Sequence, residues 1–121
     1  MNILLDSDVL IDIIKNRVEL DQKSCFINPI IYAEVLYGLL YVGKSEKQLQ
    51  EFLDEKRIEI LNIGTYTASI YTKLKLSLNK KGQPLADNDL LIAASCIEHN
   101  LHLYTQNLKH FTRVRNLKIF K

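Results

Sequence analysis

The stretch MNILLDSDVLIDII, residues 1–14, places an apolar run directly before an acidic turn and a helical pattern. Residues 2–5 are of the kind that a buried strand of a parallel sheet uses. Asp6 and Asp8 stand where helix N-cap side chains are expected, and residues 9–15 repeat apolar side chains at helical spacing. A strand that leads at once into a helix predicts the beginning of an α/β sheet.

The rest of the chain repeats this alternation of strand and helix. Asn28 and Pro29 form a helix start, with Asn at the N-cap and Pro at the first helical position. Further strands are predicted at residues 24–27, 57–61, 101–104 and 117–120, and helices at 29–42, 45–55, 65–80, 87–99 and 107–111. The inner face of the helix at 65–80 is predicted to hold Ala68, Tyr71 or Thr72, Leu74 and Leu78. We therefore predict a single domain over residues 1–121, with a three-layer α/β/α fold around a mostly parallel central sheet.

The composition is that of an ordinary globular domain. The 121 residues include 16 Lys+Arg and 14 Asp+Glu, and 47% of them are hydrophobic. No run of about 18 uncharged apolar residues is present, so a membrane span is not expected. The acidic N-terminal stretch does not resemble a signal peptide. Cys25 and Cys96 lack metal or redox spacing, which favours thiols in a reducing cytoplasm over a disulfide framework.

The small net charge of +2 conceals a segregation of charges along the chain. Residues 1–14 carry only Asp6, Asp8 and Asp12, residues 26–43 carry only Glu34, and residues 82–97 carry only Asp87 and Asp89. After Glu98 no carboxylate side chain occurs, and the charged residues are Lys109, Arg113, Arg115, Lys118 and Lys121. Isolated acids in apolar segments are the feature that a function must explain.

We expect three of these acids to meet at one edge of the sheet. Asp6 directly follows the first strand, Glu34 lies in the second turn of the helix at 29–42, and Asp89 lies in the first turn of the helix at 87–99. Ligands of open α/β sheets bind outside the carboxyl ends of the strands. Converging carboxylates would repel one another unless a hard divalent cation, Mg²⁺ or Mn²⁺, binds between them. Such a cation supports hydrolysis of phosphodiesters.

Each acid also has a structural interpretation that does not involve catalysis. Asp8 and Asp87 could cap their helices, Asp89 could interact with a helix dipole, and Asp12 is expected to face solvent. Glu34 is harder to explain in this way, because its helix offers no cation one turn away. A carboxylate in so apolar a helix must be partly buried, protonated or paired with a distant cation.

Four blocks of the sequence, in order, resemble the PIN-domain ribonucleases, and most closely the VapC-type toxins of toxin–antitoxin pairs. The opening LLDSDVLID at residues 4–12 resembles the family's LLDTNVLID. AEVLYG at 33–38 resembles its E-V-L-x-G helix, and DLLIAA at 89–94 matches D-x-L-I-A-A. LYTQNLKHF at 103–111 resembles the segment T-x-[ND]-x-x-x-F and the strand before it.

The resemblance implies roles for individual residues. Asp6, Glu34 and Asp89 would be the catalytic acids that bind Mg²⁺ or Mn²⁺. Supporting positions would be Ser7 and Thr105 as hydroxyl residues, Asn107 at the often acidic fourth position, and Asp8, where the family usually has Asn; Asp87 stands beside them as a further candidate. Asn107 in place of Asp lowers the negative charge of the site and weakens a second metal position, which favours binding of one metal ion or substrate-assisted binding. Family members typically dimerise and are inhibited by an antitoxin whose C-terminal arm reaches the acidic cleft.

We therefore predict a metal-dependent endoribonuclease, a cytoplasmic toxin with an RNA substrate, a cognate antitoxin and a homodimeric state. The acid-free stretch after residue 98 would hold the RNA backbone through Lys109, Arg113 and Arg115. One alternative is a haloacid-dehalogenase-type phosphohydrolase, in which Asp6 would be the nucleophile and Asp8 the acid. That fold needs a further acidic pair after Lys109, and none follows. The other alternative is a non-catalytic PIN-like domain that binds a partner.

Overall fold

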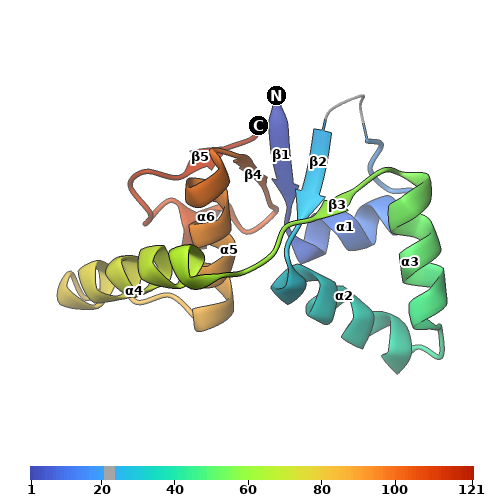
Figure 1. Cartoon of the computed structure of the whole chain (residues 1–121), viewed down its shortest axis with the longest axis horizontal. Coiled ribbons are helices and arrows are strands. Elements are labelled where there is room, and N and C mark those ends of the chain that lie inside the picture. Colours follow the sequence, from blue (N-terminus) through green and yellow to red (C-terminus); the bar gives the residue numbers. More distant parts are fainter. Residues whose placement is uncertain (21–23) are drawn as a thin grey trace.

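The computed structural model describes residues 1–20 and 24–121 and shows a twisted parallel sheet flanked by helices (Figure 1). In these residues the sheet has five strands in the order β3-β2-β1-β4-β5, and every neighbouring pair is parallel. The strands are β1 (Asn2–Leu5), β2 (Ser24–Ile27), β3 (Glu59–Ile60), β4 (His102–Tyr104) and β5 (Lys118–Ile119). The predicted fold class is confirmed, and the described sheet is wholly rather than mostly parallel.

The helices agree closely with those expected from the sequence. They are α1 (Ser7–Ile14), α2 (Pro29–Tyr41), α3 (Glu46–Glu55), α4 (Thr65–Lys80), α5 (Asp87–His99) and α6 (Leu108–Phe111). In Figure 1, α1, α2 and α3 lie to one side of β1 and α4, α5 and α6 to the other. No helix in the described part of the chain combines the length and apolar character needed to cross a bilayer.

The central position of β1 explains its uninterrupted apolar sequence. Leu4 and Leu5 have no exposed surface, and β1 is paired with β2 on one side and β4 on the other. Strands covered by helices on both faces bury successive side chains rather than alternate ones. The edge strands β3 and β5 have only two residues each, which is shorter than predicted. Short edge strands limit pairing with other chains.

The inner face of α4 differs from the prediction. Thr67 and Leu78 are buried and Tyr71 and Leu74 are partly buried, whereas Ala68 and Thr72 are exposed. The hydroxyl of Thr67 donates to Glu98 on α5 and accepts from the backbone N–H of Gly64. These hydrogen bonds make a polar residue part of the α4–α5 contact, which a search for apolar spacing cannot detect.

Candidate active site

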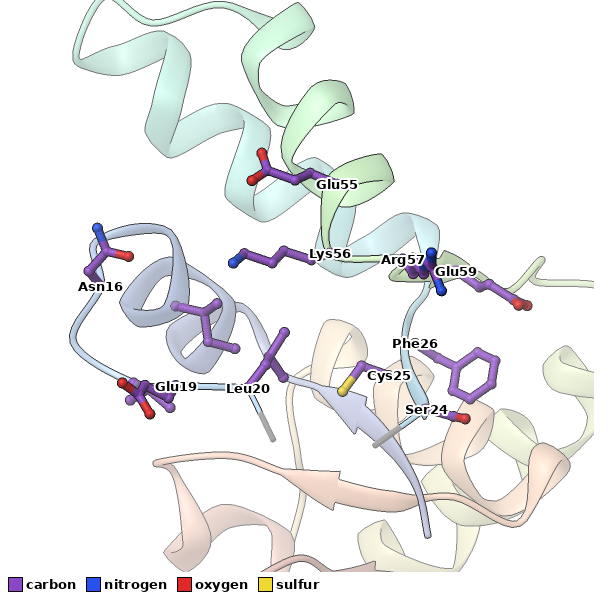
Figure 2. Close-up of a pocket in the computed structure, with 12 residues that line it drawn as sticks. Asn16, Glu19, Leu20, Ser24, Cys25, Phe26, Glu55, Lys56, Arg57 and Glu59 are labelled. Atoms are coloured by element: carbon purple, nitrogen blue, oxygen red, sulfur yellow. The ribbon is translucent and has the colours of Figure 1, made fainter. Parts of the chain in front are cut away.

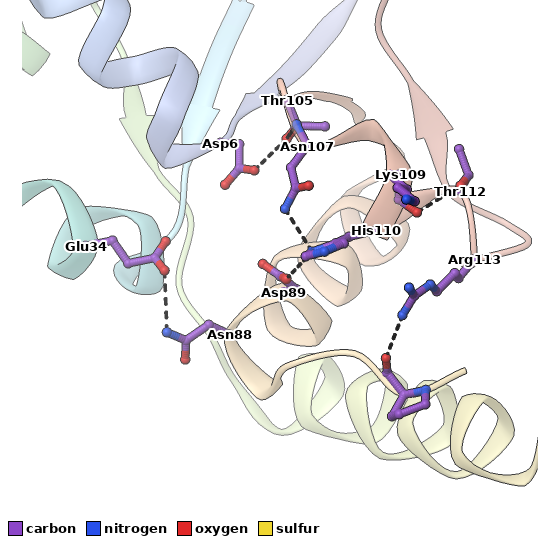
Figure 3. Close-up of polar contacts among 11 residues, drawn as sticks. Asp6, Glu34, Asn88, Asp89, Thr105, Asn107, Lys109, His110, Thr112 and Arg113 are labelled. Atoms are coloured by element: carbon purple, nitrogen blue, oxygen red, sulfur yellow. Dashed lines mark hydrogen bonds and ion pairs between the residues drawn. The ribbon is translucent and has the colours of Figure 1, made fainter. Parts of the chain in front are cut away.

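Asp6, Glu34 and Asp89 face a common space beyond the carboxyl ends of β1 and β4, as Figure 3 shows. Each comes from a different element: Asp6 from the end of β1, Glu34 from α2 and Asp89 from the first turn of α5. The sheet order places β1 beside β4, so Thr105 and Asn107, which follow β4, reach the same edge. The carboxylates expected to meet therefore lie around one site.

Asp6 is the most buried of the three acids, with 6% of its surface exposed. One carboxylate oxygen accepts from the Ser7 backbone N–H at 2.8 Å and the other accepts from the Thr105 hydroxyl at 2.7 Å. Burial raises the pKa of Asp6 and the charge of Asp89 raises it further, while the two hydrogen bonds oppose this rise. Asp6 is thus a fixed and oriented carboxylate, and no Lys or Arg in the described part of the chain forms an ion pair with it.

Glu34 is only partly satisfied by its surroundings. Its Oε2 accepts a long hydrogen bond of 3.4 Å from the Asn88 side chain, whereas Oε1 is buried without a hydrogen-bond partner among the described residues. Burial is the main cause that raises its pKa, the Ser7 and Asn88 side chains oppose the rise, and the charges of Asp6 and Asp89 add to it. Within residues 1–20 and 24–121, no Lys or Arg forms a salt bridge with Glu34.

Asp89 is linked to the segment that follows β4. Its Oδ2 lies 3.6 Å from Nδ1 of His110, and the same nitrogen lies 2.9 Å from the Asn107 side-chain amide (Figure 3). Asn107 is further fixed through its backbone N–H, which donates to the Thr105 hydroxyl at 3.0 Å. The segment from Thr105 to His110 therefore touches both Asp6 and Asp89.

Asp8 and Asp12 hold the turn after β4 rather than facing solvent. Asp8 accepts from the backbone N–H of Gln106 at 3.2 Å, and burial together with the charge of Asp6 raises its pKa. Asp12 was expected to be solvent-facing, but it is partly buried and accepts from the Gln106 side chain. Pairing of β1 with β4 brings Gln106 over α1, which explains the difference.

Asp87 neither caps α5 nor lines the site. The N-cap position belongs to Ala86, and Asp87 instead accepts from the Tyr71 hydroxyl at 2.8 Å and from Lys75 Nζ at 3.0 Å. Residues two apart on a helix point in different directions, so Asp87 turns to α4 while Asp89 turns to the site. The hydrogen-bonded ion pair with Lys75 lowers the pKa of Asp87, in contrast to Asp6, Asp8 and Glu34, whose pKa values are raised.

The predicted RNA-binding residues lie on exposed surface at and after α6. Lys109, Arg113 and Arg115 are exposed, and Arg113 Nη1 donates to the Pro84 carbonyl at 2.9 Å. Their contact with RNA stays a prediction.

Sequence reasoning missed two residues of the site, Asn88 and His110. Asn88 adjoins Asp89 in the first turn of α5, and His110 follows Asn107 by three residues, which places the two on one face of α6.

A hard divalent cation fits the donor chemistry of this site. Within the described ranges, no three His, Cys, Asp or Glu side chains stand close enough to act together as a ready-made ligand set. Mg²⁺, however, commonly takes one or two carboxylates directly and keeps several waters. The buried Oε1 of Glu34, which has no hydrogen-bond partner among the described residues, is an oxygen that such a cation would take as a ligand.

The hollow drawn in Figure 2 is separate from the acids. Its lining includes Ile13, Leu20, Cys25 and Lys56, and it contains none of Asp6, Glu34 and Asp89. The lining reaches Leu20 and Ser24, on either side of residues outside the described part of the chain, and we assign it no role.

Replacement of Thr105 by Val should remove the hydrogen bonds by which the residue after β4 orients Asp6 and Asn107. Val has nearly the same shape but lacks the hydroxyl, so Asp6 loses a donor and the Asn107 N–H loses an acceptor. We expect stability to fall by about 1–3 kcal/mol. The affinity for Mn²⁺ should fall by roughly 10–100-fold, which is the effect typical of residues that orient a metal ligand.

Urea unfolding measures the change in stability, and Mn²⁺ titration measures the change in affinity. The exposed Thr112→Val is the matched control. An unchanged Mn²⁺ affinity in Thr105→Val would contradict the orienting role.

A parallel α/β sheet with polar side chains gathered at the carboxyl ends of its strands defines the class of open α/β proteins that bind their ligands at that edge. Comparison with known proteins makes this more specific: the PIN domain matches residues 3–117, so the chain belongs to the PIN-domain family.

Relatives with known names agree with this assignment. Ribonuclease VapC2 of Rickettsia felis is 39% identical over 108 residues, which cover 84% of this chain and 78% of the relative. Ribonuclease VapC1 of Methanocaldococcus jannaschii is 34% identical over 120 residues, which cover 98% of this chain and 86% of the relative. Among solved structures, VapBC2 from Rickettsia felis bound to a promoter DNA fragment matches with a TM-score of 0.85 and 29% identity, over 99% of this chain and 98% of that one. VapBC-1 from nontypeable Haemophilus influenzae matches with a TM-score of 0.83 and 27% identity, over 100% and 98% of the two chains.

Proposed function

We propose that this protein is a divalent-metal-dependent endoribonuclease, the toxin of a toxin–antitoxin pair, which hydrolyses phosphodiester bonds of RNA. The observation that carries the proposal is the meeting of Asp6, Glu34 and Asp89 around a site that no described Lys or Arg neutralises. The ribonuclease names of its VapC relatives support RNA as the substrate. The family assignment and these names leave the phosphohydrolase alternative without support.

Asp6, Glu34 and Asp89 would hold Mg²⁺ or Mn²⁺. When bound, such a cation would act as a Lewis acid that makes hydroxide from water near neutral pH and stabilises negative charge on a phosphoryl oxygen. Thr105 and the Ser7 N–H orient the Asp6 carboxylate and favour its ionised form. Asn88 holds one oxygen of Glu34 and leaves the other available.

Exposed cations beside the site would bind the RNA backbone. Lys109, Arg113 and Arg115 follow the site segment on exposed surface, where each can contact a phosphate. Binding should therefore weaken as salt concentration rises.

The structural neighbours are VapBC toxin–antitoxin complexes, and we infer that this chain also binds an antitoxin and forms a homodimer. The end of α2 offers a candidate surface, because Tyr37 and Tyr41 are 70% and 80% exposed and their rings stack. Leu40 and Val42 extend this apolar patch, and α3 lies next to it. Exposed apolar patches of this kind mark interaction surfaces. A ribonuclease toxin of this type would act in the cytoplasm, on cellular RNA.

The decisive experiment measures RNA cleavage with Mg²⁺ or Mn²⁺, with and without EDTA. We expect EDTA to lower the cleavage rate by about 100-fold or more, because the cation supplies both nucleophile and charge stabilisation. The Asp6→Asn variant, purified in parallel, reports contaminating nuclease. Cleavage that persists in EDTA would contradict metal dependence. Hydrolysis of a phosphomonoester through an aspartyl-phosphate at Asp6 would revive the phosphohydrolase alternative, and antitoxin binding without any hydrolysis would favour the non-catalytic one.

A further inference from the structure

A buried hydrogen bond joins the two helices that carry Glu34 and Asp89. The side-chain amide of Asn28, at the N-cap of α2, donates to the hydroxyl of Ser95 on α5 at 2.9 Å. Asn28 is 0% exposed and Ser95 is 1% exposed. The Asn28 carbonyl oxygen also accepts from the Ile31 N–H at 3.0 Å, so one side chain both caps α2 and ties it to α5.

On each helix, the same number of residues separates the side chain that forms the buried bond from the acid. Glu34 lies six residues after Asn28, and Asp89 lies six residues before Ser95. At 1.5 Å per residue, each acid stands about 9 Å along its helix from the buried bond. A further polar contact between these helices, from Asn88 to Glu34, joins the first turn of α5 to the second turn of α2. From the buried bond, Glu34 lies toward the carboxyl end of α2 and Asp89 toward the amino end of α5, and the Asn88–Glu34 contact lies on the same side.

The two contacts differ greatly in strength. The Asn88–Glu34 hydrogen bond is exposed and 3.4 Å long, whereas the Asn28–Ser95 bond is short and shielded from water. Hydrogen bonds in a low-dielectric interior are stronger, and their geometry is specified more tightly. Apolar contacts, by comparison, are non-directional and would tolerate small shifts of one helix along the other.

We propose that Asn28 and Ser95 are positioning residues, which fix α2 against α5 so that Glu34 and Asp89 stand at the separation that cation binding requires. The inference rests on the proposed function, because it concerns the same metal site. Neither residue touches the substrate space; each acts through the helix that bears an acid.

The test separates positioning from stability with a double variant, Asn28→Ser with Ser95→Ala. Ser is a good N-cap, so α2 keeps its start, and the Asn28 amide donor is removed together with the Ser95 hydroxyl that accepts from it, so neither is left without the other. We expect a melting temperature near that of the wild type but an Mn²⁺ dissociation constant raised about 10-fold or more, measured by calorimetry on the full chain. The rate of RNA cleavage at subsaturating Mn²⁺ should fall in parallel.

Two further variants keep the inference falsifiable if the double variant folds poorly. Ser95→Thr retains the hydroxyl and should retain most of the Mn²⁺ affinity. Thr67→Val removes a buried hydroxyl that ties α4, which carries none of the three acids, to α5; it should lower stability and leave Mn²⁺ affinity unchanged. Wild-type Mn²⁺ affinity in a folded double variant, or an equal loss in Thr67→Val, would overturn the positioning role. Absence of Mn²⁺ binding to the wild type would instead contradict the proposed function.

Discussion

RNA cleavage is expected to fall by more than about 100-fold when Asp6 is replaced by Asn, since even a partner that only orients a metal ligand contributes roughly 10–100-fold. Asp6 is the most buried acid of the site, and its two carboxylate oxygens are oriented by Ser7 and Thr105. Asn preserves this shape but removes the charge that holds a cation. Glu34→Gln and Asp89→Asn should act in the same direction, because the three carboxylates face one space.

The measurement is single-turnover cleavage of RNA at saturating Mn²⁺, together with Mn²⁺ binding by calorimetry. Asp87→Asn is the matched control: it removes a carboxylate two residues from Asp89, but one that pairs with Lys75 on α4. We expect Asp87→Asn to cleave at a rate close to the wild type. Undiminished cleavage in all three site variants would refute the assignment of the acids.

The second large effect concerns the stability of the metal-free protein, which should decrease as pH rises from about 4 toward neutrality. The pKa values of Asp6, Asp8 and Glu34 are raised in the folded state, chiefly by burial, from ordinary values of 3.8 for Asp and 4.5 for Glu. Below those values the groups are protonated in both folded and unfolded chains. Above them the unfolded chain ionises first, so the stability of the folded state falls as pH rises, until the pH passes the raised folded pKa values; above those values the loss is complete and stays constant.

A bound divalent cation should reverse this loss near pH 7, because it stabilises the ionised carboxylates of the folded chain. At a concentration 100 times its dissociation constant, a ligand of the folded state adds about 2.7 kcal/mol. Urea unfolding at pH 5 and pH 7.5, with EDTA or Mn²⁺, measures both effects. In Asp6→Asn the metal-free protein should depend less on pH and gain little from Mn²⁺. Equal stabilisation of Asp6→Asn and wild type by Mn²⁺ would place the cation elsewhere.

Much of the fold is readable from local sequence signals. Asn28 and Pro29 specify the start of α2, and the structure shows the Asn side chain accepting from Ile31 as an N-cap should. The apolar run at 2–5 correctly indicates a strand buried on both faces. Such signals depend only on residues close along the chain, so they can be interpreted without the tertiary structure. The single-domain boundary at 1–121 stays a prediction.

Contacts between side chains that are far apart in the sequence could not be predicted as well. From the sequence, Asp89 is predicted to bind metal and Asp87 to cap the helix or support the site. The structure shows that the turn of α5 directs Asp87 to Lys75 and Asp89 toward His110. Asp12 has the appearance of a surface residue until β4 brings Gln106 across α1. These outcomes depend on helix rotation and strand order, which are set by packing of the whole chain.

By itself, the sequence determined which elements form and which acids stand alone in apolar segments, because both follow from neighbours close along the chain. Only the tertiary structure decided that Asp6, Glu34 and Asp89 share one space, that Glu34 keeps a buried oxygen unpartnered, and that Asn28 reaches Ser95. Asn28 and Ser95 are 67 residues apart, and their bond exists only because the parallel sheet brings α2 and α5 together. Burial and charge repulsion at the site arise from that same long-range packing, which no local pattern encodes.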